Sequence, residues 1–203
     1  MVSDRVGLLG GTFDPVHHGH LMLAEEARYS LALDRVLFVP AGQPPHKLHE
    51  PHTAPTHRVR MLELAIAGNP AFGISRVDLD RPGPHYSVDM VRRVRDELGQ
   101  ETELFFLMGL DSLASILAWH QPAELLAQCR LVVAHRPGFN FDLAALTEKL
   151  PILEDRLYFV EMPLIEIAGA DLRRRVQCDQ PIRYQVPEAV RHYIVEQGLY
   201  QTT

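Results

Sequence analysis

The sequence predicts an α/β fold in which a mainly parallel sheet is covered by helices. Short apolar runs alternate with stretches of helical periodicity, which is typical of repeated strand–helix units. The first apolar run ends in Gly10 and Gly11, directly before a predicted helix, as at many ligand sites of parallel sheets. A length of 203 residues suits one average domain and is too short for two. We therefore expect one domain over residues 1–203, with a helical C-terminal part from about residue 169.

The apolar runs predict six strands. They are Arg5–Gly10, Arg35–Pro40, Phe72–Leu79, Glu103–Met108, Arg130–His135 and Arg156–Glu161. Between the first two strands, the range His20–Leu31 carries apolar side chains on one helical face and charged ones on the other. The apolar face consists of Leu21, Ala24, Ala27 and Leu31.

Two further helices are predicted by their boundary residues. A second amphipathic series has Ser87 as its N-cap candidate and Gly99 just beyond its end. Pro187 stands at the first position of a last helix, which closes near Gly198. By contrast, the stretch Ala41–Pro55 contains four prolines and three histidines without an apolar period, so we expect a long functional loop there.

Composition and charge exclude several classes of protein. Apolar residues make up 46% of the chain, which is typical of a globular domain rather than a disordered or fibrous one. The formal net charge of −6 argues against binding to long nucleic acid or to an anionic membrane, although a few cations suffice for a small anionic substrate. Cys129 and Cys178 form no CxxC pair, and no signal peptide or membrane-spanning run is visible. We therefore expect a reduced, cytoplasmic protein.

The segment Gly10–His20 suits a phosphate cradle. Glycines let backbone N–H groups approach phosphate oxygens, and the following helix adds the positive end of its dipole. The segment matches neither the dinucleotide pattern GxGxxG nor the P-loop. His17 and His20 are three residues apart at a helix start, so both imidazoles are expected on one side, where they would stabilise charge on a leaving phosphate. Taken alone, this spacing is more often a tight turn with solvated histidines.

The pattern GGTFDPxHxGH over residues 10–20 resembles the signature of bacterial nicotinate mononucleotide adenylyltransferases, within the HxGH nucleotidyltransferase superfamily. Further matches follow in the family's order and extend over nearly the whole chain. They are Pro-Pro-His-Lys at 44–47, Pro-His-Tyr-Ser at 84–87, Gly-Leu-Asp-Ser-Leu at 109–113, Trp119 and Arg-Pro-Gly at 136–138. HxGH specifies only the superfamily, whereas the Pro-Pro-His-Lys, Tyr-Ser and Trp119 matches select this family over phosphopantetheine or glycerol-phosphate nucleotidyltransferases.

The resemblance implies a Rossmann-like, doubly wound sheet and the transfer of an adenylyl group from ATP to nicotinate mononucleotide. The products are deamido-NAD and pyrophosphate, and Mg²⁺ accompanies ATP. Because the acceptor's own phosphate oxygen attacks the α-phosphorus in line, the protein needs no nucleophile. Its tasks are alignment and neutralisation of charge on the leaving pyrophosphate.

The resemblance also implies roles for individual residues. His17 and His20 would contact the α- and β-phosphates, and Lys47 and Arg173 would bring cations to the triphosphate. The residues implied in ATP binding are Gly10, Gly11, Thr12, Phe13, Gly19, Gly109, Asp111 and Arg136. Of these, Thr12 would position the reacting phosphate and Gly19 would leave room beside the adenine.

On the acceptor side, the resemblance implies that Tyr86, Ser87 and Trp119 bind the mononucleotide. Donors around Tyr86 and Ser87 would favour the acid over the amide, and the Trp119 ring would lie across the pyridinium. Three implied residues also have ordinary structural alternatives: Lys47 as a solvated loop lysine, Asp111 as a helix N-cap, and Trp119 as a core residue.

The sequence departs from the family in one segment. The family usually has Ile-Ser-Ser-Thr-x-x-Arg at a helix start near the C-terminus, whereas residues 167–173 read Ile-Ala-Gly-Ala-Asp-Leu-Arg. Arg173 is retained, but Ala168 and Ala170 lack the phosphate-binding hydroxyls. A hydrogen bond to a charged group is worth about 1.5–3 kcal/mol, so we expect weaker use of ATP than in the relatives. Backbone N–H groups at the helix start, with Gly169 permitting close approach, are the available replacement.

Two other functions and one metal site stay open. The chain is alternatively a nucleotidyltransferase of the same superfamily with another phosphorylated acceptor, or a nucleotide-binding paralogue that has lost catalysis. The spacing of His46, His49 and His52 permits a zinc site, but spacing alone rarely makes one, so we expect no protein-bound metal. The oligomeric state does not follow from the sequence.

Overall fold

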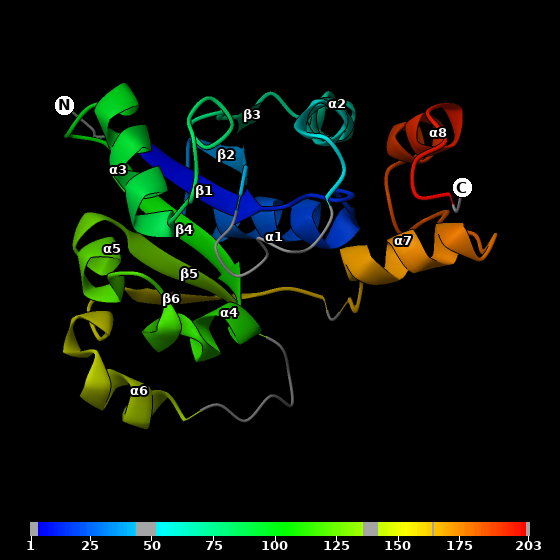
Figure 1. The fold of residues 1–203 in the computed structure, drawn as a ribbon. Coiled ribbons are helices and arrows are strands. Elements are labelled where there is room, and N and C mark those ends of the chain that lie inside the picture. The colour runs from blue at the N-terminus through cyan, green and yellow to red at the C-terminus, as the bar shows by residue number, and fades with distance from the viewer. Residues whose placement is uncertain (1–3, 44–51, 136–141, 164, 202–203) are drawn as a thin grey trace.

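The computed structural model describes residues 4–43, 52–135, 142–163 and 165–201. The described strands form one sheet in the order β3-β2-β1-β4-β5-β6, and every neighbouring pair is parallel (Figure 1). The strands are β1 (Arg5–Gly11), β2 (Arg35–Pro40), β3 (Phe72–Ile74), β4 (Glu103–Gly109), β5 (Arg130–His135) and β6 (Leu157–Glu161). This order confirms the predicted Rossmann-like, doubly wound sheet.

Helices cover both faces of the sheet (Figure 1). They are α1 (His18–Ser30), α2 (Pro55–Ile66), α3 (Ser87–Leu98), α4 (Leu110–Ala114), α5 (Pro122–Gln128), α6 (Leu143–Lys149), α7 (Gly169–Gln177) and α8 (Glu188–Glu196), with 3₁₀ turns at Ile116–Ala118 and Pro151–Leu153. Within the described ranges, no helix combines the length and the apolar composition that crossing a membrane requires.

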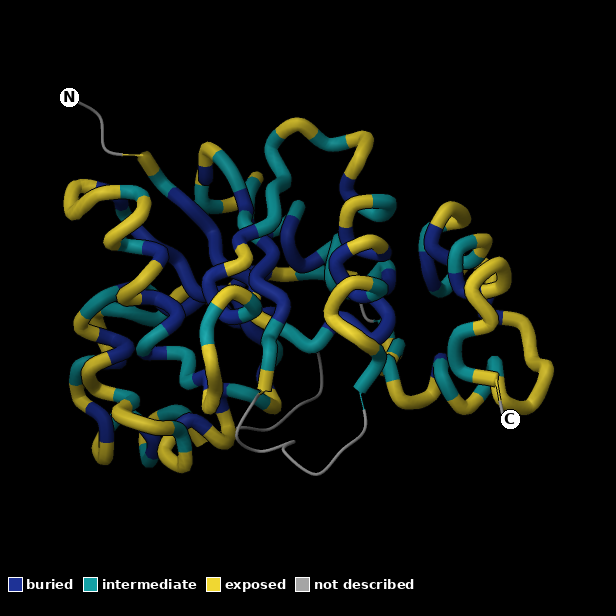
Figure 2. Tube along the Cα trace, turned by 45° about the horizontal axis from the view of Figure 1, so that its top comes forward, coloured by how far each residue is buried: buried dark blue, intermediate teal, exposed yellow. Residues whose placement is uncertain are grey.

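The side chains of the central strands alternate between two buried clusters, one on each face of the sheet. In β4, Leu104, Phe106 and Met108 belong to the cluster that includes residues of α3 and α5. Phe105 and Leu107 belong to the other cluster, which includes residues of α1, α2, α7 and α8. This alternation follows from the two-residue period of a strand, and Figure 2 shows the centre of the molecule as largely buried. The C-terminal helices thus share their core with the first two helices.

The strand predictions hold except at one edge of the sheet. The expected strand Phe72–Leu79 ends at Ile74, so the prediction is wrong for residues 75–79. After it the chain turns at Arg76, whose carbonyl oxygen accepts the N–H groups of Leu79 at 2.8 Å and Asp80 at 3.1 Å. The Arg76 and Asp80 side chains also pair, at 3.0 Å. This turn satisfies its polar groups locally, which an extended edge strand would not do.

The first helix begins two residues earlier than predicted, because His17 takes its N-cap position. Leu23 joins the predicted Ala24 and Ala27 in the core, whereas Leu31 lies just past the helix end and is only partly buried. The predicted amphipathic face is therefore present but is shifted around the helix.

Other helix boundaries differ by one residue, and α2, α5 and α6 lie outside the predicted helical ranges. Ser87 is the first residue of α3 rather than its N-cap, because the Tyr86 carbonyl oxygen already accepts helical hydrogen bonds. Gly99 ends that helix with a φ of 99°, as predicted. Pro187 lies one residue before α8. Of these three, α2 begins at Pro55, the last residue of the predicted long loop.

The carboxyl ends of β1 and β4 lie side by side at the centre of the sheet. The sheet order reverses between these two strands, and a reversal of this kind is where ligands bind in open α/β sheets. The motif segment follows β1, and α4 follows β4 directly. The fold therefore places the predicted phosphate cradle at the expected ligand site.

Candidate functional site

His17 and His20 lie where β1 leads into α1. Their imidazole rings stack, with centroids 3.7 Å apart and planes inclined by 26°. The His17 backbone N–H donates to His20 Nδ1 at 3.2 Å. The Phe13 ring packs edge-on against His20, with a centroid distance of 5.0 Å. Both imidazoles therefore lie on one side, as their spacing predicts.

Both histidines are neutral at pH 7. Burial lowers the pKa of His17 to about 4, and the neighbouring His18 is a smaller cause. The pKa of His20 is also lowered, first by its enclosed surroundings and then by His17. Because His20 Nδ1 accepts a hydrogen bond, the proton of the neutral ring is on Nε2. His20 thus presents an N–H donor without carrying a charge.

The glycines of the motif differ in how much space a side chain would find at each position. A Cβ at Gly19 would lie 3.2 Å from His17 Nδ1, and one at Gly11 would lie 3.0 Å from the Phe13 ring. By contrast, a Cβ at Gly10 would meet ordinary contacts at 3.7 Å, and one at Gly109 would meet nothing within 4 Å. Gly19 therefore makes room for the His17 ring, and its role beside the adenine stays a prediction.

Asp14, in the middle of the motif, joins three distant segments. It is only 4% exposed. Its carbonyl oxygen accepts from Arg173 Nη1 at 2.7 Å, its Oδ1 from the Tyr200 hydroxyl at 2.7 Å, and its Oδ2 from the Thr53 N–H at 3.0 Å. His52 Nδ1 lies 3.9 Å from Oδ2. Arg173, predicted to bind phosphates, therefore lies against the motif segment.

Arg58 of α2 lies underneath the same segment and is 1% exposed. It donates from Nη1 to Thr12 O at 2.7 Å and from Nε to Thr53 O at 3.0 Å. Burial lowers the pKa of its guanidinium, and the nearby Asp14 carboxylate acts in the opposite direction. An arginine starts from so high a pKa that it stays charged here. A buried cation thus fixes the backbone between Gly11 and Asp14.

The residues predicted for the acceptor lie around the start of α3 and the 3₁₀ turn that follows α4. The Tyr86 ring stacks on His120, with centroids 4.2 Å apart and an interplanar angle of 30°. Trp119, next to His120 in the chain, packs edge-on against Phe106 of β4 at 5.9 Å. Trp119 is partly buried, so it contacts the core and keeps exposed surface. The structure therefore brings Tyr86, Ser87 and Trp119 into one region.

The remaining predicted residues divide into two groups. Asp111 is exposed in the first turn of α4, and the residue before that helix holds the N-cap position, so the N-cap alternative for Asp111 is wrong. Lys47 and Arg136 lie outside the described residues, as do His46 and His49 of the proposed zinc spacing. In the part of the chain that the structure describes, no three His, Cys, Asp or Glu side chains cluster as metal ligands would.

Comparison with known proteins identifies the family of this chain. The model of the cytidylyltransferase-like family matches residues 8–175. The chain belongs to this family. It is 51% identical over 198 residues to a probable nicotinate-nucleotide adenylyltransferase of Thermomicrobium roseum, covering 98% of this chain and 92% of the relative. A protein of the same name from a Roseiflexus species is 46% identical over 201 residues, covering 99% and 100%.

A solved structure supports the fold of this cytidylyltransferase-like chain. It is Plasmodium falciparum nicotinic acid mononucleotide adenylyltransferase complexed with NaAD. The two share a TM-score of 0.79 over 97% of each chain, at 18% sequence identity.

Sequence reasoning singled out Arg173 but missed Arg58 and Tyr200, which also anchor the site of this cytidylyltransferase-like protein. For Arg58 a signal exists, because it stands beside the apolar Val59, Met61 and Leu62 on the buried face of α2. A charged residue on an otherwise apolar helical face indicates a buried partner. Tyr200 follows the last helix outside any periodic pattern and offers no comparable signal.

The segment that departs from the resembled family lies at the motif. Ala168 holds the N-cap position of α7 without a side-chain cap, and Ala170 is exposed in the first turn. A Cβ at Gly169 would lie 3.0 Å from Asp14 O, so glycine allows the helix start to approach the motif. The N–H groups of that helix start are therefore available as anion donors near Arg173.

Proposed function

We propose that the chain transfers the adenylyl group of ATP to nicotinate mononucleotide and releases deamido-NAD and pyrophosphate. The stacked His17–His20 pair carries this proposal. It lies where the strand order reverses between β1 and β4, which is where open α/β sheets bind ligands, and its imidazoles suit hydrogen bonding to phosphate oxygens. The names of the relatives from Thermomicrobium and Roseiflexus, at 51% and 46% identity, support both the reaction and the acceptor.

The reaction needs alignment and charge neutralisation rather than a protein nucleophile. A phosphate oxygen of the mononucleotide forms a bond to the α-phosphorus, while the bridging P–O bond between the α- and β-phosphates breaks and its electron pair leaves with pyrophosphate. The neutral His20 ring donates its Nε2–H toward this charge, and Arg173 supplies positive charge from the adjoining helix. Lys47 keeps its predicted role as a second cation.

Mg²⁺ enters the proposal as part of the substrate MgATP. Mg²⁺ takes oxygen ligands and keeps several waters, so triphosphate oxygens suit it. At the motif, the imidazoles and the Arg173 guanidinium suit phosphate rather than the cation, and the buried Asp14 carboxylate already accepts hydrogen bonds from Tyr200 and Thr53. When bound, the ion supplies charge neutralisation on the phosphates.

The proposed partners are small molecules, ATP and nicotinate mononucleotide. Tyr86, Ser87 and Trp119 are the residues that we assign to the mononucleotide. The net charge of −6 disfavours long nucleic acid as a ligand. Cys129 and Cys178 are both free thiols, which fits the reducing cytoplasm that we propose as the compartment.

The experiment combines the protein with ATP, Mg²⁺ and either nicotinate mononucleotide or the corresponding amide. Pyrophosphate release and chromatography of the dinucleotide report the reaction. We expect product from the acid and slower product from the amide. His20→Ala should lower kcat/KM by about 10²–10³-fold, as the loss of a charge-stabilising donor does elsewhere. His192→Ala, which removes an exposed histidine from α8, should leave kcat/KM unchanged.

Two outcomes would overturn the proposal in different ways. Pyrophosphate release with other phosphorylated acceptors, but not with nicotinate mononucleotide, would assign another nucleotidyltransferase reaction. Binding of ATP without release of pyrophosphate for any acceptor would indicate a nucleotide-binding paralogue.

A further inference from the structure

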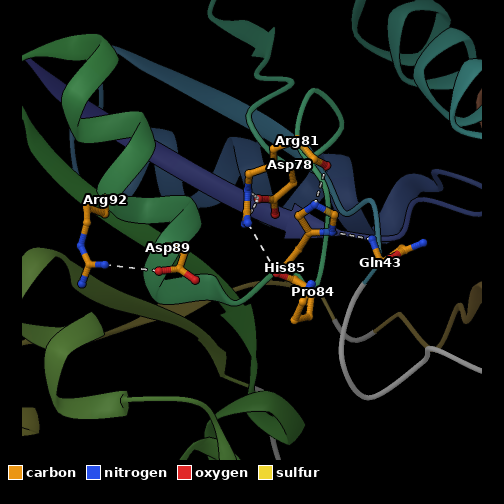
Figure 3. A network of polar contacts seen from close by, with 7 residues as sticks. All are labelled: Gln43, Asp78, Arg81, Pro84, His85, Asp89 and Arg92. Carbon is orange, nitrogen blue, oxygen red and sulfur yellow. Dashed lines mark hydrogen bonds and ion pairs between the residues drawn. The ribbon is translucent and has the colours of Figure 1, made fainter.

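The His85 imidazole, 7% exposed, connects two segments at the acceptor side of the sheet. Its Nδ1 accepts the Gln43 backbone N–H at 2.7 Å, and its own backbone N–H donates to Gln43 O at 3.2 Å. Its Nε2 lies 3.2 Å from the Arg81 carbonyl oxygen. Figure 3 shows the ring between these two partners. One residue thus ties the chain that follows β2 to the turn that precedes α3.

Both ring contacts define one form of the imidazole. A backbone N–H donates to Nδ1, so that atom carries no hydrogen, and the Arg81 carbonyl accepts, so Nε2 carries one. The neutral Nε2–H form makes both bonds at once. An asparagine offers an amide oxygen near the position of Nδ1, whereas phenylalanine keeps the ring shape and removes both bonds.

Glycines enclose this ring. A Cβ at Gly42 would lie 2.6 Å from His85 Cε1 and 2.7 Å from the Asp78 carbonyl oxygen. One at Gly83 would lie 2.9 Å from Gln43 Oε1. A backbone oxygen yields less easily than the end of a side chain, so glycine is needed most at position 42. The two segments are thus packed directly against each other around His85.

The turn itself is held by a buried ion pair. Arg81 Nη2 lies 2.7 Å from Asp78 Oδ1, with side chains 13% and 8% exposed, and Arg81 Nη1 donates to Pro84 O at 3.4 Å (Figure 3). The chain then passes through one residue to Tyr86 and Ser87, where α3 begins. Any movement at position 85 is therefore transmitted to the two residues that we assign to the acceptor.

We propose that His85 is a positioning residue for the acceptor mononucleotide: by joining the start of α3 to Gln43, it fixes where Tyr86 and Ser87 meet the substrate. This inference rests on the proposed function. Among the described residues, His85 makes its hydrogen bonds with Gln43 and Arg81 and none with Asp14, Arg58 or the other residues that anchor the phosphate motif. Its loss should therefore affect acceptor binding more than ATP binding.

The test measures KM and kcat for each substrate in His85→Phe and His85→Asn. We expect His85→Phe to raise KM for nicotinate mononucleotide by roughly five- to tenfold, with KM for ATP within about twofold. His85→Asn, which retains an acceptor for the Gln43 N–H, should recover most of that loss. Arg92→Gln, which removes an exposed ion pair from the same helix, is the control and should behave as wild type (Figure 3).

Equal increases in both KM values, or unchanged KM values with only a lower melting temperature, would overturn the inference. So would an Asn variant no better than Phe. If His85→Phe does not fold, we compare KM for nicotinate mononucleotide in His85→Gln and His85→Asn, because glutamine does not place an oxygen near the Nδ1 position. Equal KM values in these two variants would then contradict the proposal. A wild-type protein inactive with the mononucleotide would instead contradict the proposed function.

Discussion

The phosphate side of the site is held by side chains from far away in the sequence. Arg58, Arg173 and Tyr200 reach the motif across 46, 159 and 186 residues. All three bond to Thr12 or Asp14, which lie between the first strand and the first helix. The conformation of the motif therefore depends on α2, α7 and the C-terminal segment being packed in place. Here the shape of the site is a property of the whole fold.

The acceptor side is held mainly by its own neighbours. Asp78, Arg81 and His85 contact one another within seven residues of chain, and one link, from His85 to Gln43, spans 42 residues. A local turn of this kind is able to shift without exposing the core. The two sides should therefore respond differently to mutation: damage to the phosphate side lowers stability and ATP use together, and damage to the acceptor side alters substrate affinity alone.

The largest expected effect is at Arg58. Arg58→Met removes a buried cation together with its two hydrogen bonds, and it leaves the Asp14 carboxylate without that positive neighbour. We therefore expect the free energy of unfolding to fall by roughly 3 to 5 kcal/mol. Urea denaturation measures it. Arg60→Met, on the exposed side of the same helix and paired with Glu63, should cost less than about 1 kcal/mol. Equal losses in the two variants would contradict a structural role for Arg58.

The second prediction concerns pH and His17. Its pKa is about 4 in the folded protein against an ordinary 6.5, so the unfolded chain binds the proton more readily. The stabilising contribution is complete above pH 6.5 and is lost as pH falls toward 4, with a total of at most about 3 kcal/mol.

The measurement compares the free energy of unfolding of wild type and His17→Gln from pH 7.5 to 4. Their difference should change over this window, because glutamine does not titrate. A pH-independent difference would mean that His17 titrates normally in the folded protein.

Local motifs of the site could be predicted from the sequence, whereas its long-range anchoring contacts could not. The glycine pair, the His17–His20 spacing and the strand ranges follow from local patterns, because the residues that we assign to the chemistry lie at the ends of elements with clear periodicity. The contacts of Arg58 and Tyr200 do not, since Asp14 meets Tyr200 only once α8 has packed on α2. The edge strand after Phe72 was overestimated for a related reason: charges at positions 76 and 80 satisfy each other in a turn.

An intermediate effect is expected at Tyr200. Burial, and then the adjacent Asp14 carboxylate, raise the pKa of its hydroxyl, so the hydroxyl keeps its proton and donates to Asp14. Tyr200→Phe leaves that oxygen without its donor and should cost about 1–3 kcal/mol of stability. KM for ATP should rise more than KM for the mononucleotide. The matched control is Tyr184→Phe, because Tyr184 is 86% exposed. A Tyr200 variant that behaves like this control would contradict a role of the C-terminal segment in holding the motif.

The smallest expected effect is an increase in kcat/KM for ATP. Ala168 is the uncapped N-cap of α7, and Ala170 lies in its first turn, both exposed. Ala168→Ser/Ala170→Thr adds hydroxyls at a helix start that already offers backbone N–H groups, so we expect kcat/KM for ATP to rise by roughly tenfold, equal to about 1.4 kcal/mol. Gly169 is left unchanged, because a side chain there would press on Asp14 O. Steady-state kinetics at saturating mononucleotide measure the change. No gain would mean that the backbone donors of α7 already satisfy the phosphates, and the phosphate side would then depend on the fold even more completely than its anchors indicate.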